Sequence, residues 1–283
     1  MCHGVRQQTI NAIPRTQSSI AVSSDGIDWV LFNTSPDILT QIQQCGVLQP
    51  ARQLRDTGIR SIVLMDAQID HTTGLLMLRE HKQPLSIWCT AAVREDLSEG
   101  NPLFKVLTHY CDIDWNELNI DAGQYSIPGA DTVVFQPLAL TSNAPPYSPH
   151  RDKPVAGDTL GMFMKTTDSQ KSVFYAPGLG EMEDAVWAAM QKADVVLIDG
   201  TMWTDDEMIQ RGASAKTARS MGHLPQSGPG GMIEWLDQLP STTRKILIHI
   251  NNTNPILDDD SSERATLTEH GIEVAHDGME IEL

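Results

Sequence analysis

Aromatic, cationic and cysteine residues are all scarce in this chain of 283 residues. Aromatic residues make up 5%, so the core must be mainly aliphatic. Lysine and arginine number 20 against 37 aspartates and glutamates, and the formal net charge of -17 argues against nucleic acid as a partner. The four cysteines, at positions 2, 45, 89 and 111, are scattered, which is typical of reduced thiols rather than of a disulfide framework.

Long apolar runs are also missing from the sequence. No segment reaches the length of a transmembrane helix, and the N-terminus has no apolar signal core. We therefore predict a cytoplasmic protein without a membrane span. The remaining composition, 40% hydrophobic and 20% charged, is ordinary for a globular domain.

Short apolar runs alternate with helix-like patterns along the chain, which predicts an α/β fold. An Asp-Gly turn at 25–26 joins the first two runs as a hairpin. The predicted strands are 19–22, 29–32, 62–65, 85–89, 133–135, 160–163, 173–175, 195–198 and 246–250. The predicted helices begin near 38, 75, 91, 103, 183, 233 and 263.

The segment from Thr141 to Pro154 is rich in proline and serine. Proline removes backbone donors, so we predict an irregular loop here. A long irregular loop within a compact domain is usually functional.

Several ligand-capable side chains follow predicted strands. Asp70 and His71 follow one strand, Asp199 and His249 end two others, and His223 comes after a glycine. Each residue alone has a commoner explanation, because aspartates cap helices and buried histidines bond to the backbone. Their shared position at strand exits indicates a metal site instead, since ligands bind at that edge of α/β sheets. The spacing leaves both interpretations open.

A family resemblance adds to this pattern. Residues 66–71, Asp-Ala-Gln-Ile-Asp-His, stand where metallo-β-lactamase-fold proteins carry an HxHxDH motif, and 199–201, 222–223 and 247–249 resemble later motifs of that superfamily. Longer segments resemble the pyrroloquinoline quinone (PQQ) biosynthesis protein B family, from about Pro14 to Leu283. They are 14–21, 69–75, 144–151, 175–180 and 249–255. The resemblance implies one αββα sandwich domain over residues 17–283.

The first two histidines of the superfamily motif are replaced by Asp66 and Gln68. This follows the pattern of the family but removes the usual first metal pocket of the di-zinc hydrolases. Asp70, His71 and His249 remain as the metal ligands that the resemblance implies. Two imidazoles and a carboxylate match the facial triad that holds Fe(II), and zinc would also accept them.

The N-terminus departs from the family, which usually opens with a strand and a C-x-C-x-x-C cluster resembling a structural zinc site. Here Cys2 alone stands at the position of the last cysteine. We expect residues 1–16 to be an irregular remnant of this knuckle, either because the start was assigned too far downstream or because the knuckle was lost. A structural zinc is expected only in the full-length family form.

The resemblance implies an enzyme of PQQ biosynthesis, an iron- and oxygen-dependent hydroxylase of the tyrosine ring in the cross-linked Glu-Tyr precursor. His223 is then the expected acid or base, with a ligand role or a structural role as the alternatives. Asp199 either orients a ligand or approaches the metal. The residues expected to bind the substrate are Tyr147, His150, Arg151, Asn252 and Asn254.

Two other classes of function stay open. A carrier of PQQ or its precursor toward the periplasm would need the pocket but no turnover. A metal-dependent hydrolase follows from the fold alone and is weakened by the loss of the first two histidines. The expected partners are the small-molecule precursor, other PQQ biosynthesis proteins and a second copy of the chain in a homodimer.

Overall fold

The computed structural model describes residues 1–283, which form two compact units. The first unit comprises Met1–Arg15, Leu140–Ser142 and Lys171–Met279. The second unit comprises Thr16–Ala139, Asn143–Gln170 and Glu280–Leu283. The prediction of one domain over 17–283 stays a prediction, because the contacts divide the chain along different boundaries.

A five-stranded sheet forms the centre of the second unit, with its strands in sequence order. The first two strands pair antiparallel, as the Asp-Gly turn predicts, and the others pair parallel. These strands are β1 (Ile20–Val22), β2 (Trp29–Phe32), β3 (Ile59–Val63), β4 (Leu85–Cys89) and β5 (Ile113–Glu117).

Short helices cover one face of this sheet and bury an aliphatic core. Leu85, Ile87 and Cys89 occupy alternate positions of β4, so all three point to the same face and join the core. Ile38 and Ile42, four residues apart on α2, meet the same core. The helical elements are α2 (Ile38–Gln44), η1 (Gly46–Leu48), α3 (Ile69–Thr72), η2 (Thr73–Leu78), α4 (Ala91–Glu95), the π turn η3 (Asp96–Gly100) and α5 (Leu103–Leu107).

Three more strands of the second unit pair antiparallel in the order β6 (Tyr125–Ser126), β7 (Val133–Ala139) and β8 (Leu160–Thr166). The strand β7 is longer than predicted and includes Pro137. Because β6 pairs only with Val134 and Phe135, Pro137 lies where that edge of β7 has no partner in β6, a position at which proline is tolerated.

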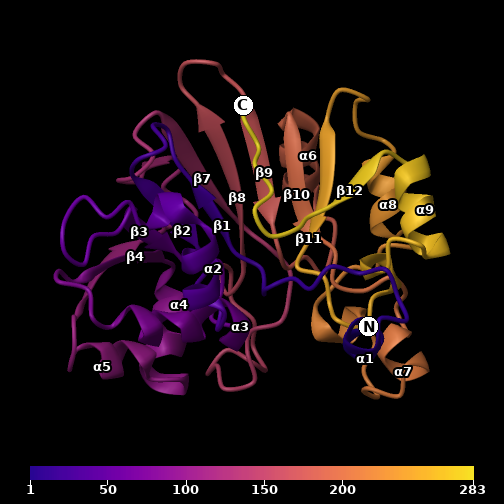
Figure 1. The fold of residues 1–283 in the computed structure, drawn as a ribbon, viewed down its shortest axis with the longest axis horizontal. Helices are drawn as coiled ribbons and strands as arrows, with labels where there is room; N and C mark the ends of the chain where they lie inside the picture. Colours follow the sequence, from indigo (N-terminus) through magenta and orange to yellow (C-terminus); the bar gives the residue numbers. More distant parts are fainter. The chain divides into compact units, whose positions relative to one another are not determined.

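The first unit contains a parallel sheet in the order β12-β11-β10-β9 (Figure 1). Every residue of β10 is buried, which explains its continuous apolar run up to Asp199. Its strands are β9 (Ser172–Ala176), β10 (Val195–Asp199), β11 (Arg244–Ile248) and β12 (Ile272–Val274). Its helices are α1 (Cys2–Gln7), α6 (Asp184–Lys192), α7 (Glu207–Gln210), η4 (Arg219–Met221), α8 (Met232–Leu236), η5 (Pro255–Leu257) and α9 (Ser262–Glu269). None of the helices in either unit combines the length and apolarity that crossing a membrane would require.

The expectation of an irregular N-terminal segment is wrong for residues 2–7, which form α1, while residues 9–19 have no regular structure. The helix ends at Gln8, whose left-handed backbone (φ 55°) lets its amide reach the carbonyl groups of Gly4 and Val5. Ile10 then packs against Gly4, where a side chain would leave less room. No residue of α1 is buried, so the helix adds little to the core.

Candidate metal centre

The ends of β10 and β11 lie side by side in the first unit. Asp199 is in register with Ile248, so the parallel pairing places His249 just past the end of the neighbouring strand. The sequence predicted both residues at strand exits, and the register brings these exits to one edge of the sheet.

The Asp199 carboxylate is fully buried and accepts four hydrogen bonds. Oδ2 accepts from the backbone amide of Leu179 at 3.0 Å and from His223 Nδ1 at 2.6 Å. Oδ1 accepts from the amide of Thr201 at 2.9 Å and from its hydroxyl at 2.5 Å. Because both oxygens are engaged, Asp199 is suited to orienting a neighbour rather than to binding an ion itself.

Charge keeps the Asp199 carboxylate ionised. Burial alone would raise its pKa, but the interactions with His223 and His249 outweigh burial and hold the pKa below its ordinary value. A carboxylate in this state stabilises a positive charge on the imidazole of His223.

His223 follows Gly222, whose backbone (φ 87°) lies in the left-handed region that favours glycine. Its backbone amide donates to the carbonyl of Ala218 at 3.0 Å, which fixes the residue. The bond from Nδ1 to Asp199 places the ring proton on Nδ1 and the lone pair on Nε2. His223 is thus bonded through its side chain to a carboxylate, which is the arrangement of a metal ligand or a proton carrier.

Thr201 performs the corresponding task for His249. Its hydroxyl lies 2.5 Å from Asp199 Oδ1, 2.9 Å from the carbonyl of His249 and 2.8 Å from His249 Nδ1. The hydroxyl has one proton, and the ionised carboxylate is its strongest acceptor. Nδ1 of His249 must then carry its own proton and donate it to the hydroxyl, which leaves the lone pair on Nε2.

The two imidazoles lie together. Their ring centroids are 5.6 Å apart and the planes are inclined by 23°. Nitrogen and carboxylate atoms of Asp199, His223 and His249 lie within 4.8 Å of one another. His249 itself has a positive φ of 61°, a conformation that a residue without glycine's freedom adopts at a cost and that is typical of functional sites.

A third histidine in the second unit is held in the same way. Nδ1 of the buried His71 lies 2.8 and 2.9 Å from the two oxygens of Asp66. The bond leaves the lone pair on Nε2, and the half-exposed Asp70 carboxylate lies 3.8 Å from that nitrogen. A carboxylate oxygen of Asp70 and Nε2 of His71 are therefore close enough to contact the same metal ion.

The replacements of the superfamily histidines have structural tasks here. Asp66 orients His71 and also accepts from the amide of Gln68 at 2.9 Å. The Gln68 side chain donates to the carbonyl of Asn143 at 2.9 Å. Both side chains thus stabilise the loop that carries His71, and the loss of the usual first metal pocket stays a prediction.

The donor set fits a divalent transition metal in chemical type. Three histidines each carry an oxygen partner on Nδ1, the arrangement by which proteins orient metal-binding imidazoles. A carboxylate stands beside one of them. That Asp70, His71 and His249 bind one ion stays a prediction.

The side chains expected to bind substrate from the long loop contact the protein itself. Tyr147 donates to the carbonyl of Ala67, and burial raises the pKa of its phenol to about 12. His150 Nε2 lies 3.1 Å from Glu95, and Arg151 donates to the backbone. These bonds tie the loop, which is irregular as predicted, to the second unit.

The two asparagines of the 249–255 motif differ in environment. Asn252 is exposed, whereas Asn254 is fully buried and donates to the carbonyl of Gly200 at 3.0 Å. Asn254 thus supports the loop after β10 that carries Thr201. Sequence reasoning did not assign a role to Thr201 or Asp66, although both lie within motifs that it singled out.

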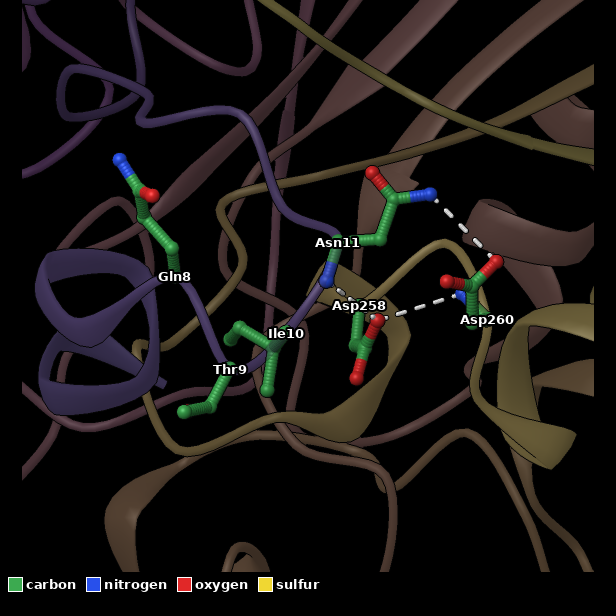
Figure 2. A pocket seen from close by; sticks show the side chains of 6 residues that line it. All are labelled: Gln8, Thr9, Ile10, Asn11, Asp258 and Asp260. Atoms are coloured by element: carbon green, nitrogen blue, oxygen red, sulfur yellow. Dashed lines mark hydrogen bonds between the residues drawn. The ribbon is translucent and has the colours of Figure 1, made fainter.

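The N-terminal segment borders a separate pocket in the first unit (Figure 2). Asp258 accepts from the amide of Asn11 at 3.1 Å, and the Asn11 side chain donates to Asp260 at 3.4 Å. The pocket is thus the space beside a polar anchor for residues 8–11. Cys2 is an exposed free thiol.

Comparisons with known proteins define the class. The Beta-lactamase superfamily domain family matches residues 28–250. The crystal structure of Zn(2+)-bound PqqB from Methylobacterium extorquens matches with a TM-score of 0.88 and 33% identity, over 100% of this chain and 92% of that one. A diphosphatase from the PhnP family matches with a TM-score of 0.63 at 17% identity, over 95% and 85%, and so shares the fold alone. The chain has a metallo-β-lactamase-like α/β fold.

Relatives narrow this class to one family. Coenzyme PQQ synthesis protein B of Azoarcus sp. (strain BH72) is 67% identical over 282 residues, which cover 100% of this chain and 92% of the relative. The protein of the same name from Nitrosococcus oceani is 57% identical over 285 residues, covering 99% and 92%. The chain belongs to the coenzyme PQQ synthesis protein B family, as its motifs predicted.

Proposed function

We propose that this chain is a metal-dependent hydroxylase of PQQ biosynthesis that acts on the tyrosine ring of the cross-linked Glu-Tyr precursor. The observation that carries the proposal is the common state of His71, His223 and His249. Each has its Nδ1 engaged by an oxygen, so each has Nε2 as the nitrogen for a metal ion or a proton.

We assign Asp70, His71 and His249 as the metal ligands. Two imidazoles and one carboxylate leave coordination positions open, which suits Fe(II) in oxygen chemistry. When bound, Fe(II) would supply the activation of oxygen. Zinc is the ion named for the related protein from Methylobacterium extorquens, so the same donors are expected to accept zinc.

We assign His223 as the acid or base and Asp199 as its positioning residue. Nε2 of His223 would take a proton from the substrate, and the charge that develops on the ring is stabilised by Asp199 through the 2.6 Å bond to Nδ1. Thr201 keeps the lone pair of His249 on Nε2. In the overall reaction a ring C–H bond becomes C–OH, and the second oxygen atom leaves as water at the expense of an added reductant.

A carrier of the precursor or of PQQ is the second candidate. The polar anchoring of the long loop through Tyr147 and His150 favours neither function, because a carrier and an enzyme both need an ordered wall. A hydrolase is disfavoured, since Asp66 and Gln68 bond within the protein where the di-zinc hydrolases have the histidines of their first metal pocket.

The test is turnover by protein reconstituted anaerobically with Fe(II). The cross-linked precursor, a reductant and isotopically labelled oxygen are added, and mass spectrometry follows the product. Incorporation of label into the ring supports the hydroxylase. Stoichiometric binding of the precursor without product supports the carrier, and cleavage of a phosphodiester supports the hydrolase.

A further inference from the structure

Two consecutive polar residues at the end of β2, Asn33 and Thr34, are completely buried in the second unit. Their neighbours Phe32, Val63 and Leu64 are apolar and equally buried. Polar groups are retained in such surroundings only where hydrogen bonds compensate for the lost water.

Asn33 holds the beginning of the loop that carries Asp66 and His71. Its side-chain Oδ1 accepts from the backbone amide of Met65 at 3.0 Å. The carbonyl of Met65 in turn accepts from the amide of Leu160 at 2.8 Å, so this peptide is fixed from both sides. Met65 directly precedes the carboxylate that orients His71.

Thr34 holds the other end of the same loop. Its backbone amide donates to the carbonyl of His71 at 2.7 Å, and its own carbonyl accepts from the amide of Gly74 at 3.0 Å. The approach at Gly74 is close, since a Cβ there would lie 2.2 Å from the carbonyl oxygen of Ser35. Glycine is therefore required for this end of the loop to reach β2.

Two features of Asn33 are energetically unfavourable, although they accompany its hydrogen bond to Met65. Its φ of 59° lies in the left-handed region, and its buried Nδ2 has no partner among the protein atoms. A glycine would adopt this backbone more easily and would bury no unpaired amide. The hydrogen bond that the asparagine side chain makes in return is the one to Met65. Strained buried residues of this kind are concentrated at functional sites.

We propose that Asn33 is a positioning residue of the metal centre. Together with Thr34 it clamps residues 65–71 at both ends, so that Asp66 meets Nδ1 of His71 and Nε2 is presented next to Asp70. This inference rests on the proposed function in one respect, because it takes His71 to be a ligand.

The variant N33G tests the clamp. It keeps the left-handed backbone and deletes only the side chain, so relief of strain offsets part of the cost of the lost bond and the melting temperature should fall less than in a variant with a cavity in the main core. The dissociation constant for Zn²⁺ alone should rise 10-fold or more, as for other groups that orient metal ligands. G74A perturbs the opposite end and should act in the same direction.

A matched control separates positioning from stability. L107A removes a buried side chain of α5 in the core of the same unit. It should lower the melting temperature and leave Zn²⁺ affinity within a factor of two or three.

A second measurement needs no metal. Long-range proton–nitrogen NMR reads the tautomer of His71, with the His71→Gln variant to identify its signals. The original chain should show one tautomer with the proton on Nδ1, and N33G should show averaging of the two. Unchanged Zn²⁺ affinity and an unchanged tautomer in N33G would overturn the inference. Absence of metal binding by the original chain would refute the proposed function, whereas the tautomer would still decide the clamp.

Discussion

The buried carboxylate of Asp199 and the imidazole of His223 form a hydrogen bond of 2.6 Å between Oδ2 and Nδ1. The same carboxylate bonds to the hydroxyl of Thr201, which contacts His249. One buried carboxylate thus contacts His223 directly and His249 through Thr201, and so favours the tautomer of each ring that has its proton on Nδ1. Substitutions of Asp199, His223 and Thr201 can test what this arrangement does for function.

Replacement of His223 by alanine should preserve the metal and reduce turnover by ~100-fold or more, since a positioned acid or base typically contributes this much. Metal content, melting temperature and product are measured on the same preparation. A fall in metal content would make His223 a ligand. Unchanged turnover per folded molecule would remove it from the mechanism.

D199N should also reduce turnover, because an amide neither stabilises the imidazolium of His223 nor fixes its tautomer. We expect the metal content to fall less than the rate. The pH dependence of the rate gives the check: the ionisation assigned to His223 should move to lower pH once the carboxylate is lost. An unchanged profile would contradict the assignment of Asp199.

T201V should weaken metal binding by about 10- to 100-fold, because the hydroxyl that accepts from Nδ1 of His249 is lost while the size of the side chain is kept. T201S restores the hydroxyl and is the matched control. Titration with Zn²⁺ against a chromophoric chelator measures both. Equal affinities for the valine and serine variants would show that the hydroxyl does not orient His249.

Asp96 predicts a pH dependence of stability in the second unit. Burial raises the pKa of Asp96 to about 6, and the negative charge of the nearby Asp158 acts in the same direction. The hydrogen bond from the Ser148 hydroxyl lowers the pKa but does not outweigh burial. Since the folded state prefers the protonated form, this contribution to stability is complete below about pH 4 and is lost as the pH rises through about 6.

D96N should therefore be more stable than the original chain at pH 7, by up to about 3 kcal/mol. The difference in unfolding free energy between the two proteins should grow from pH 4 to pH 7 in urea titrations. The exposed neighbour Glu99 supplies the control, because E99Q should leave the pH dependence of the unfolding free energy unchanged. If the unfolding free energies of D96N and the original chain changed with pH in the same way, the prediction would be contradicted.

Much of the fold follows from local pattern. The buried aliphatic run of β10 and the apolar C-terminal ends of β3 and β11 make these strands predictable from sequence, and β4 alternates between buried and partly buried residues as a strand does. The short strands β5 and β6 and the helix α7 were not predicted. The residues of β5, Ile-Asp-Trp-Asn-Glu, are only partly buried, and its register with β4 comes from tertiary pairing rather than from an apolar signal.

The sequence allowed us to predict that aspartates and histidines at the ends of strands form the candidate site. The tasks of Asp66 and Thr201 were not predictable, because they depend on which ring nitrogen each side chain reaches. Asn33 illustrates the same limit, since it reads as a turn residue and becomes a clamp only when Met65 is placed beside it. Hydrogen bonds between distant residues require the three-dimensional arrangement.

The most direct test of the account is the iron content of the chain after anaerobic reconstitution, compared among the original protein and the variants H71A and H249A. We predict one Fe(II) per original chain and less than about a tenth of that in each variant, because each variant lacks one of the three proposed ligands. Circular dichroism confirms that the variants are folded. Full iron binding by either variant would contradict the claim that His71 and His249 hold a single metal ion.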